Sequence, residues 1–217
     1  MKTVAIVPIK LNSKRVKNKN FKKVFDIPLY QIILNKIKKA NFDEIYVDTD
    51  SDKIKQFCIK KNIFIIDRLK KLTRDNANGN DLLNYHYKIV KADLYFQIFI
   101  TAPLLSIKSI NKCISLLKKK RKNDSILTVN KIYSWFWFKK KPINYLPKVL
   151  PRSQDAKPII QETTGLYGIT NQALKKYKCR IGKRPIFFNV PRHESLDLDT
   201  KEDFLAIKTY AKKYLFH

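Results

Sequence analysis

The sequence is poor in glycine, cysteine and acidic residues, and these shortages exclude several classes of protein. Its 217 residues include four glycines, three cysteines and 18 Asp and Glu against 46 Lys and Arg. The cysteines are odd in number, widely spaced and never arranged as CxxC, so neither a disulfide framework nor a structural zinc site is expected. No apolar run approaches the roughly 20 residues of a membrane-spanning helix, and the apolar start after Met1 is too short for a signal peptide. We therefore expect a cytoplasmic protein in a reducing environment.

The excess of basic residues gives a formal net charge of +28, which admits two interpretations. A nucleic-acid-binding protein would carry such a charge, and the runs at Lys118–Lys122 and Lys139–Lys141 fit that class. However, only eight of the 46 basic residues are arginine, the residue that suits bidentate contacts with phosphates and bases. A lysine bias on solvated faces and at helix C-termini is therefore favoured, and nucleic-acid binding is kept as the alternative.

Short apolar segments alternate with amphipathic segments, which is typical of an α/β fold. Strands are expected at residues 3–8, 44–48, 63–67, 94–100, 125–129, 163–169 and 186–190. Helices are expected at residues 28–40, 51–61, 81–92, 106–122, 171–177 and 200–214. This order predicts one domain with a doubly wound, mostly parallel sheet, in which ligands bind at the carboxyl ends of the strands. We expect one crevice there, formed by the loops at 10–20, 49–51, 68–79, 101–105 and 197–199.

One stretch interrupts this alternation. Residues 131–160 contain both tryptophans, Trp135 and Trp137, together with four prolines and no periodic pattern. A bare loop of this length is unusual in a compact domain. Two interpretations remain open: a flap that folds over its own domain, or a protruding arm that docks on a second subunit, where large aromatic side chains dominate interface energies.

The loop after the first expected strand carries residue types that hold phosphates. It offers five basic residues, a serine and three asparagines: Lys10, Lys14, Arg15, Lys17, Lys19, Ser13, Asn12, Asn18 and Asn20. It has no glycine, so it is neither a Walker nor a Rossmann fingerprint, although asparagine can adopt the left-handed conformations that glycine usually supplies. A solvated basic turn explains this composition equally well.

Asp197 and Asp199 are a candidate metal site. If their segment is extended, the two carboxylates share one face, and such a pair suits Mg²⁺ together with phosphate oxygens of a substrate. The same region also fits a helix start, because Glu202 and Asp203 would complement the helix dipole; both readings can hold at once. The isolated histidines, among them His86, are most simply structural.

These segments, taken in order, resemble the acylneuraminate cytidylyltransferases (CMP-sialic acid synthetases), a family that activates nonulosonic acids. The opening VAIVPIKLNSKRVKNKNFKKV is similar to the family's IPAR-x-x-SKR-x-x-x-KN, and SLDLDTKEDF is similar to D-I-D-T-x-E-D. Between them lie further matches at VDTDSDKI, DRLKKLTRDNAN, ITAPLL, PRSQDAKP and TTGLYGIT. Each match is weak alone, but the ordered set covers nearly the whole chain.

The resemblance implies a nucleotide-diphospho-sugar transferase-like, Rossmann-like fold and a homodimer in which residues 131–160 form a dimerisation arm reaching the neighbouring active site. It also implies a cytidylyltransferase that transfers CMP from CTP to a sugar acid such as a sialic-acid-like nonulosonic acid, releasing pyrophosphate. Mg²⁺ or Mn²⁺ is the implied cofactor, and no nucleic-acid or membrane partner is expected.

The same resemblance assigns site residues by position. The catalytic cations that neutralise the leaving phosphates are Lys14, Arg15 and Lys19. The nucleotide-binding residues are Lys10, Asn12, Ser13, Asn20, Asp48, Thr49, Asp50, Arg68 and Asp75. The sugar-binding residues are Thr101, Arg152 and Gln154, with Arg152 contacting the sugar across the dimer, and the metal carboxylates are Asp197 and Asp199.

Several departures from the family pattern bear on the substrate. Lys10 stands where the family has an arginine and keeps the charge without the bidentate donor. Phe99 replaces a glutamine, Leu105 an arginine and Thr164 an asparagine. Two of these changes fall where the family contacts the sugar acid. The alternatives are therefore a related enzyme for another keto-sugar acid, such as a KDO-like one, or a catalytically inactive nucleotide-binding relative.

Overall fold

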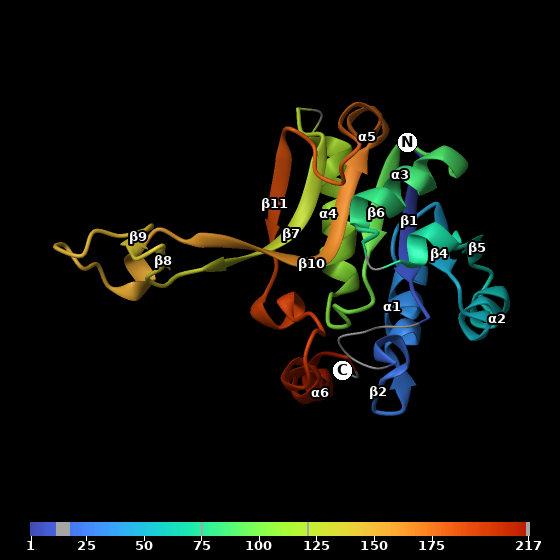
Figure 1. Ribbon diagram of the computed structural model, residues 1–217, viewed down its shortest axis with the longest axis horizontal. Helices are drawn as coiled ribbons and strands as arrows, with labels where there is room; N and C mark the ends of the chain where they lie inside the picture. The colour runs from blue at the N-terminus through green and yellow to red at the C-terminus, as the bar shows by residue number, and fades with distance from the viewer. Residues whose placement is uncertain (12–17, 75, 121, 216–217) are drawn as a thin grey trace.

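The computed structural model describes residues 1–11, 18–74, 76–120 and 122–215. Its centre is a seven-stranded sheet in the order β11-β7-β10-β6-β1-β4-β5 (Figure 1). These strands are β1 (Thr3–Ile9), β4 (Glu44–Thr49), β5 (Phe64–Asp67), β6 (Leu94–Ile98), β7 (Ser125–Ile132), β10 (Ile159–Thr170) and β11 (Pro185–Asn189). All neighbouring pairs are parallel except those of β10, which runs antiparallel to both β6 and β7. The predicted mostly parallel sheet is therefore confirmed.

Strand β1 shows why helices cover both faces of the sheet. Its side chains point alternately to the two faces, and nearly all of them are buried. Ala5, Val7 and Ile9 share one core with helices α1, α2 and α4, whereas Val4 and Ile6 pack with α3 and α5. The helices are α1 (Leu29–Lys38), α2 (Asp52–Lys60), α3 (Gly79–Ile89), α4 (Ile107–Lys119), α5 (Asn171–Tyr177) and α6 (Lys201–Tyr214). Among the described residues, no helix combines the length and the apolar character needed to cross a membrane.

Helix α6 is attached through a smaller core. Ile207 and Ala211 of α6 pack with Leu29 and Ile32 of α1 and with the fully buried Leu198. Leu198 separates the two acids of the predicted metal site. Because its side chain is anchored in this core, the segment that carries Asp197 and Asp199 is fixed against α1.

Capping chemistry sets the helix starts. Ser106 caps α4 by accepting a hydrogen bond from the Ser109 N–H (3.1 Å), as the predicted start requires. Thr200 and Asp203 form a capping box at α6, so the predicted acidic helix start is present. Helix α3 begins two residues before the expected residue 81, because Asn78 caps it in a second capping box.

Residues 133–158 project from the sheet and are called the arm below (Figure 1). The arm contains β8 (Trp137–Phe138), β9 (Lys141–Pro142) and the 3₁₀ turn η3 (Ser153–Asp155). It connects β7 to β10, which are longer than predicted because they stay paired as far as Ile132 and Ile159. The arm does not fold back over the sheet (Figure 1), so the flap interpretation is wrong; docking of the arm on a second subunit stays a prediction.

The arm has defined local structure but little core. The Asn144 amide donates to the carbonyls of Ser134 (2.6 Å) and Lys157 (2.8 Å) and ties the two ends of the arm together. Its large apolar side chains nevertheless face solvent, with Leu146 and Val149 each 70% exposed. The arm therefore presents apolar surface that the chain does not cover by itself.

The lysine runs lie where the solvated interpretation places them. Lys118 and Lys119 occupy the last turn of α4, where cations complement the helix dipole. Lys139 and Lys140 form the turn between β8 and β9.

Candidate functional site

The loop after β1 is held at both of its ends. The Leu11 N–H donates to Asp50 Oδ1 (2.6 Å), and the Asn20 amide donates to the Lys10 carbonyl (2.5 Å). Asn18 adopts the left-handed conformation (φ 54°), as anticipated for an asparagine of this loop. Five predicted site residues lie outside the described residues: Asn12, Ser13, Lys14, Arg15 and Asp75.

Lys19 joins this loop to the acidic segment. It belongs to the 3₁₀ turn η1 (Lys19–Phe21), is buried, and its Nζ lies 2.8 Å from Asp199 Oδ1. Asp199 is also fixed by its backbone, since its N–H donates to Asp203 Oδ2 (3.0 Å). Burial tends to raise the pKa of Asp203, but hydrogen bonds from the backbone N–H groups of Asp199 and Thr200 hold this pKa below its usual range.

Asp197 presents a carboxylate oxygen that is buried and has no hydrogen-bond partner among the described residues. Asp197 and Asp199 line one cavity, so the structure brings the two predicted metal ligands to a common space. A buried carboxylate oxygen without a partner suits a hard cation. Within the described part of the chain, no group of three or more His, Cys, Asp or Glu side chains is arranged to hold a metal ion. The two carboxylates of Asp197 and Asp199 nevertheless fit an ion such as Mg²⁺, because this ion takes only one or two carboxylates and completes its shell with substrate oxygens and water.

The turn after β6 adjoins the acidic segment. The Leu198 N–H donates to the carbonyl of Thr101 (2.8 Å), which places this predicted sugar-binding residue beside the acid pair. Gly165 of β10 packs against the same turn, since a Cβ at residue 165 would lie 3.1 Å from that of Ala102.

Asp48, Arg68 and His86 form a buried polar network at the end of β4. Asp48 Oδ1 lies 3.0 Å from Arg68 Nε, and Asp48 Oδ2 lies 2.7 Å from His86 Nε2. Burial works to raise the pKa of Asp48, but the His86 hydrogen bond and the Arg68 charge hold it below the usual range. Both carboxylate oxygens of this predicted nucleotide-binding residue are therefore engaged within the chain. Asp48 orients Arg68 through one oxygen, and His86 hydrogen-bonds to the other oxygen.

The neighbouring residue Thr49 belongs to the same strand end. Its carbonyl accepts from the Arg68 N–H (3.2 Å), and its hydroxyl accepts from the Ser51 N–H (3.1 Å). Lys19 and Thr101 thus contact the acidic segment directly, whereas in the described structure the segments at 49–51 and 68 reach it only through the loop after β1, by way of the Leu11–Asp50 bond. That all these loops line one crevice stays a prediction.

A cavity of about 950 Å³ lies beside the acid pair. Its walls come from the base of the arm, from β10 and from the 3₁₀ turn η4 (Arg192–Ser195). They include Asn130, Tyr133, Glu162, Thr164, Arg192, Asp197, Asp199 and Asp203. In a chain of net charge +28, the described residues that line this cavity include four carboxylates and only two cations, Lys131 and Arg192, so carboxylates outnumber cations there.

Arg152 and Gln154 are not brought to this cavity within the chain. Both lie on the arm, which extends away from the sheet (Figure 1), and the Arg152 side chain is 76% exposed and paired with Asp155 (2.6 Å). The predicted sugar contact of Arg152 was a contact across a dimer, and only a second copy of the chain can supply it.

Sequence reasoning missed a set of residues around Tyr167. Its hydroxyl donates to Glu162 Oε2 (2.7 Å), and the Arg180 guanidinium stacks 3.7 Å from its ring centroid. Burial and the Glu162 hydrogen bond raise the pKa of Tyr167. Gln97, fully buried on the adjacent strand, has a side-chain oxygen without a partner in the described structure. Tyr167 lies in the matched segment TTGLYGIT, which was the available signal; Arg180 follows no motif.

Thr164 sits at a bulge in β10 where the pairing with β7 shifts register. Its φ of 54° is a left-handed conformation that a β-branched residue rarely adopts, and its buried hydroxyl finds no partner in the described structure. The resembling family has an asparagine at this position, which tolerates that backbone better. This departure therefore carries a conformational cost.

Comparison with solved structures agrees with this architecture. The chain is similar to a CMP:2-keto-3-deoxy-manno-octonic acid synthetase complexed with CTP (TM-score 0.72, 16% identity, covering 98% of this chain and 99% of that one). It is also similar to a 4-diphosphocytidyl-2C-methyl-D-erythritol synthase from Anaerococcus prevotii DSM 20548 (TM-score 0.69, 14% identity, 98% and 97%). At such identities the likeness establishes the fold, which is nucleotidyltransferase-like.

Sequence comparison identifies the family. Two N-acylneuraminate cytidylyltransferases of Streptococcus agalactiae are similar, one from serotype III strain NEM316 (21% identical over 218 residues) and one from serotype V strain ATCC BAA-611 / 2603 V/R (23% over 224). Each match covers 95% of this chain and 52% of the relative, so the chain spans about half the length of these curated relatives. A family model described as cytidylyltransferase matches residues 4–178. The chain therefore belongs to the cytidylyltransferase family.

Proposed function

We propose that this chain transfers CMP from CTP to a 2-keto sugar acid of the nonulosonic type and releases pyrophosphate. The observation that carries the proposal is the ion pair between Lys19 Nζ and Asp199 Oδ1, which lie 2.8 Å apart at the carboxyl ends of the parallel strands. It brings the cationic loop after β1 to the acid pair beside a cavity of about 950 Å³. Ligands of open α/β sheets bind at this edge. The family and the fold both agree with a nucleoside triphosphate as the donor of the nucleotidyl group.

The reaction is an in-line displacement at phosphorus. The anomeric hydroxyl of the sugar acid attacks the α-phosphorus of CTP, a new P–O bond forms, and the bond to the bridging oxygen breaks so that pyrophosphate leaves. The hydroxyl proton passes to solvent. Such a step depends on positioning and on neutralising charge. We assign this neutralisation to Lys14, Arg15 and Lys19, with the Asp199 carboxylate holding the Lys19 ammonium in place.

Asp197 and Asp199 would hold the Mg²⁺ or Mn²⁺ ion. When bound, such an ion supplies Lewis-acid stabilisation of charge on the phosphate oxygens. Asp197 fits this role because its buried Oδ1 has no partner in the described structure, and Asp199 because it lines the same cavity. The cap of α6 orients Asp199 through the Asp203 carboxylate, so the ligand pair is fixed before substrate arrives.

Two classes of acceptor compete. A sialic-acid-like nonulosonic acid is supported by the two Streptococcus relatives, and a KDO-like acid by the structural similarity to the 2-keto-3-deoxy-manno-octonic acid synthetase. Phe99 and Leu105 replace family residues near the sugar acid and favour an altered acceptor. We propose the nonulosonic acid first and the KDO-like acid second.

We also propose that the functional unit is a homodimer joined through the arm. The arm leaves Leu146 and Val149 mostly exposed, and it carries Arg152 and Gln154 away from the site of their own chain (Figure 1). Docked on a neighbour, the arm would cover its apolar surface and bring these two residues to the neighbouring sugar acid. We place the reaction in the cytoplasm, where CTP is made and where the free thiols of all three cysteines persist.

Pyrophosphate release tests the proposal directly. Each of the four nucleoside triphosphates is combined, with Mg²⁺, with a panel of 2-keto sugar acids that includes a sialic acid and KDO. Release with CTP and one acid class is expected, and it identifies the acceptor. CTP binding without release for any pair would favour the inactive relative. Salt-sensitive binding of nucleic acid without CTP binding would instead favour the nucleic-acid-binding class.

A further inference from the structure

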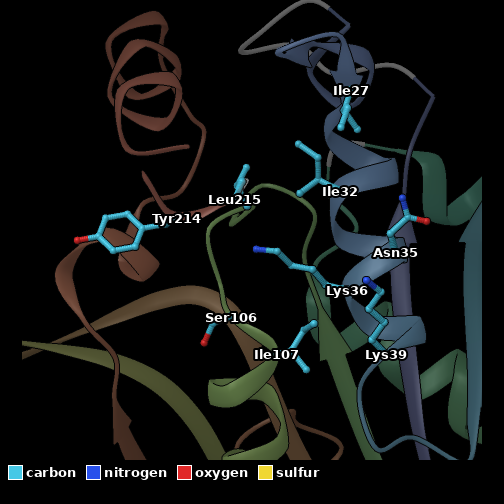
Figure 2. Close-up of a pocket in the computed structure, with 9 residues that line it drawn as sticks. All are labelled: Ile27, Ile32, Asn35, Lys36, Lys39, Ser106, Ile107, Tyr214 and Leu215. Carbon is cyan, nitrogen blue, oxygen red and sulfur yellow. The ribbon is translucent and has the colours of Figure 1, made fainter. Parts of the chain in front are cut away.

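Lys36 of α1 is a partly buried cation outside the cluster of predicted site residues. Its Nζ donates to the carbonyls of Pro103 (2.7 Å) and Leu105 (3.0 Å). Figure 2 shows the side chain leaving α1 and pointing toward the segment before α4, beside a cavity of about 390 Å³. One ammonium group therefore fastens two carbonyls of the same turn.

The turn needs such a donor because it is buried. Ala102, Leu104 and Leu105 are each at most 2% exposed, so the carbonyl groups among them have little access to water. Buried backbone carbonyls without a partner are costly. Two consecutive turns in this segment use the N–H groups of Ala102 and Leu105, and Lys36 satisfies carbonyls that these turns leave open.

Glu194 acts on the same junction from η4. It is buried, and its Oε2 accepts from the Ser106 N–H (3.2 Å) at the start of α4. Burial lowers the pKa of Lys36 to about 8, and the negative charge of Glu194 opposes this lowering. The two charges therefore stabilise each other across the turn without a direct ion pair in the described structure.

The turn transmits its position to the acid pair. The Thr101 carbonyl accepts from the Leu198 N–H (2.8 Å), and Leu104 packs in the same small core as Leu198. Leu198 lies between Asp197 and Asp199. A shift of this turn consequently shifts both carboxylates, although Lys36 itself touches neither of them in the described structure.

Lys36 thus binds two carbonyls of the turn that holds the acidic segment. We propose that Lys36 is a positioning residue: it clamps the turn Thr101–Leu105 and, through Leu198, sets the placement of Asp197 and Asp199 for phosphoryl transfer.

Amide hydrogen exchange tests the clamp without any substrate. In Lys36→Met, the Leu198 and Leu105 amides should exchange about tenfold faster or more, because the turn loses both side-chain bonds. In the control Lys39→Met, which removes an exposed lysine beside the same cavity, exchange should stay within about twofold of wild type. Unchanged protection of Leu198 in Lys36→Met would overturn the clamp. If that variant does not fold, Lys36→Gln, whose amide is too short to reach both carbonyls, replaces it.

Kinetics separate positioning from a purely structural role, and this part rests on the proposed function. Lys36→Met should lower kcat for pyrophosphate release by roughly 10- to 100-fold, because small misplacements of reacting groups are costly, while KM for CTP changes little. Lys36→Arg should restore most of kcat, since the adjoining cavity has room for a guanidinium. Lost protection with unchanged kcat would show that Lys36 is structural only. A wild-type chain without turnover would overturn the proposed function, and the exchange comparison would still decide the clamp.

Discussion

Two arginine–aspartate pairs of this chain lie in opposite surroundings. Arg68 and Asp48, 3.0 Å apart, have side chains 3% and 0% exposed at the end of β4. Arg152 and Asp155, 2.6 Å apart, are 76% and 48% exposed on the arm. The shorter pair is the one that water screens, so distance alone does not measure what each pair contributes.

Apolar side chains show the same distribution. The sheet encloses residues such as Val7 completely, whereas Leu146 and Val149 on the arm are mostly exposed. In the sheet region, the chain itself encloses the Arg68–Asp48 pair and residues such as Val7. On the arm, the Arg152–Asp155 pair and the large apolar side chains face solvent, a composition that suits a surface covered by a second chain. Experiments that disturb each region should therefore give different kinds of result.

The largest effect is expected for Asp48→Asn. Removing this charge leaves Arg68 buried without its partner, and the free energy of unfolding should fall by about 3–5 kcal/mol in urea denaturation at pH 7. The exposed counterpart Asp155→Asn should cost no more than about 1 kcal/mol. Equal losses in the two variants would contradict the contrast between the regions.

The free energy of unfolding that Asp48 contributes should depend on pH in one direction. The pKa of Asp48 is lower in the folded chain than in the unfolded chain. Its contribution to stability is therefore present above the unfolded value of about 3.9 and is lost as the pH falls through the folded value. The difference between wild type and Asp48→Asn should be constant from about pH 5 to 7 and shrink below about pH 4. A difference that grows on acidification would contradict this assignment.

The next effect concerns Asp199→Ala. Pyrophosphate release should fall by roughly 100- to 1,000-fold, because the variant loses a metal ligand and frees the Lys19 ammonium. Circular dichroism should show a folded protein. Asp52→Ala, which removes a 91% exposed carboxylate, is the matched control and should keep full activity. Near-normal release from Asp199→Ala would remove this residue from the metal site.

Arg152→Ala should raise KM for the sugar acid about tenfold or more while leaving CTP binding unchanged. Mixing it with Asp199→Ala sharpens the comparison, because the two residues would serve one site from different chains. The re-equilibrated mixture should regain roughly a quarter of wild-type activity at low sugar-acid concentration, since about half of its dimers are mixed and each of these has one intact site of two. No recovery on mixing would exclude the cross-subunit contact.

A smaller effect is expected for the double variant Leu146→Ser and Val149→Ser. If the arm is an interface, the dimer dissociation constant should rise about 10-fold or more in analytical ultracentrifugation. The thermal midpoint of the monomer should hardly change, because neither side chain is buried within its own chain. A monomeric wild type would contradict the proposed dimer. A dimer of unchanged affinity in the variant would place the interface elsewhere.

The smallest effect is expected at the join of the two regions. Thr164→Asn should raise the stability by about 1 kcal/mol, since asparagine adopts the left-handed backbone more easily than a β-branched residue. Thermal unfolding measures it, with Thr163→Asn as the destabilising control, because the Thr163 hydroxyl donates to Thr128. A destabilised Thr164→Asn would show that the bulge depends on the threonine.

The sequence predicted the elements that local chemistry determines. Helix α5 occupies 171–177 as expected, and Ser106 caps α4, because periodicity and caps are local signals. The direction of β10 was not predictable, since its pairing depends on strands far away in the sequence. The burial of Asp48 was missed for the same reason: its partners, Arg68 and His86, are 20 and 38 residues away.

In the candidate site, too, some features were predictable from the sequence and others were not. Motif order predicted that the loops meet, and the contacts of Lys19 and Thr101 with the acidic segment confirm the meeting for these two loops. Lys36 and Arg180 were not predicted as functional, because a lysine in an amphipathic helix and an arginine outside any motif look like solvated charges. Only the folded chain shows that each cation has a specific neighbour.

The antiparallel direction of β10 makes one strand serve both regions. Ile159 and Ile160 pair with β7 at the root of the arm, and a few residues later the Gly165 carbonyl accepts from the Phe99 N–H (3.1 Å) beside the turn of Thr101. Both points belong to the one strand β10, which is interrupted between them by the bulge at Thr164. A second chain bound to the arm would therefore act on the same strand that forms a wall of the cavity.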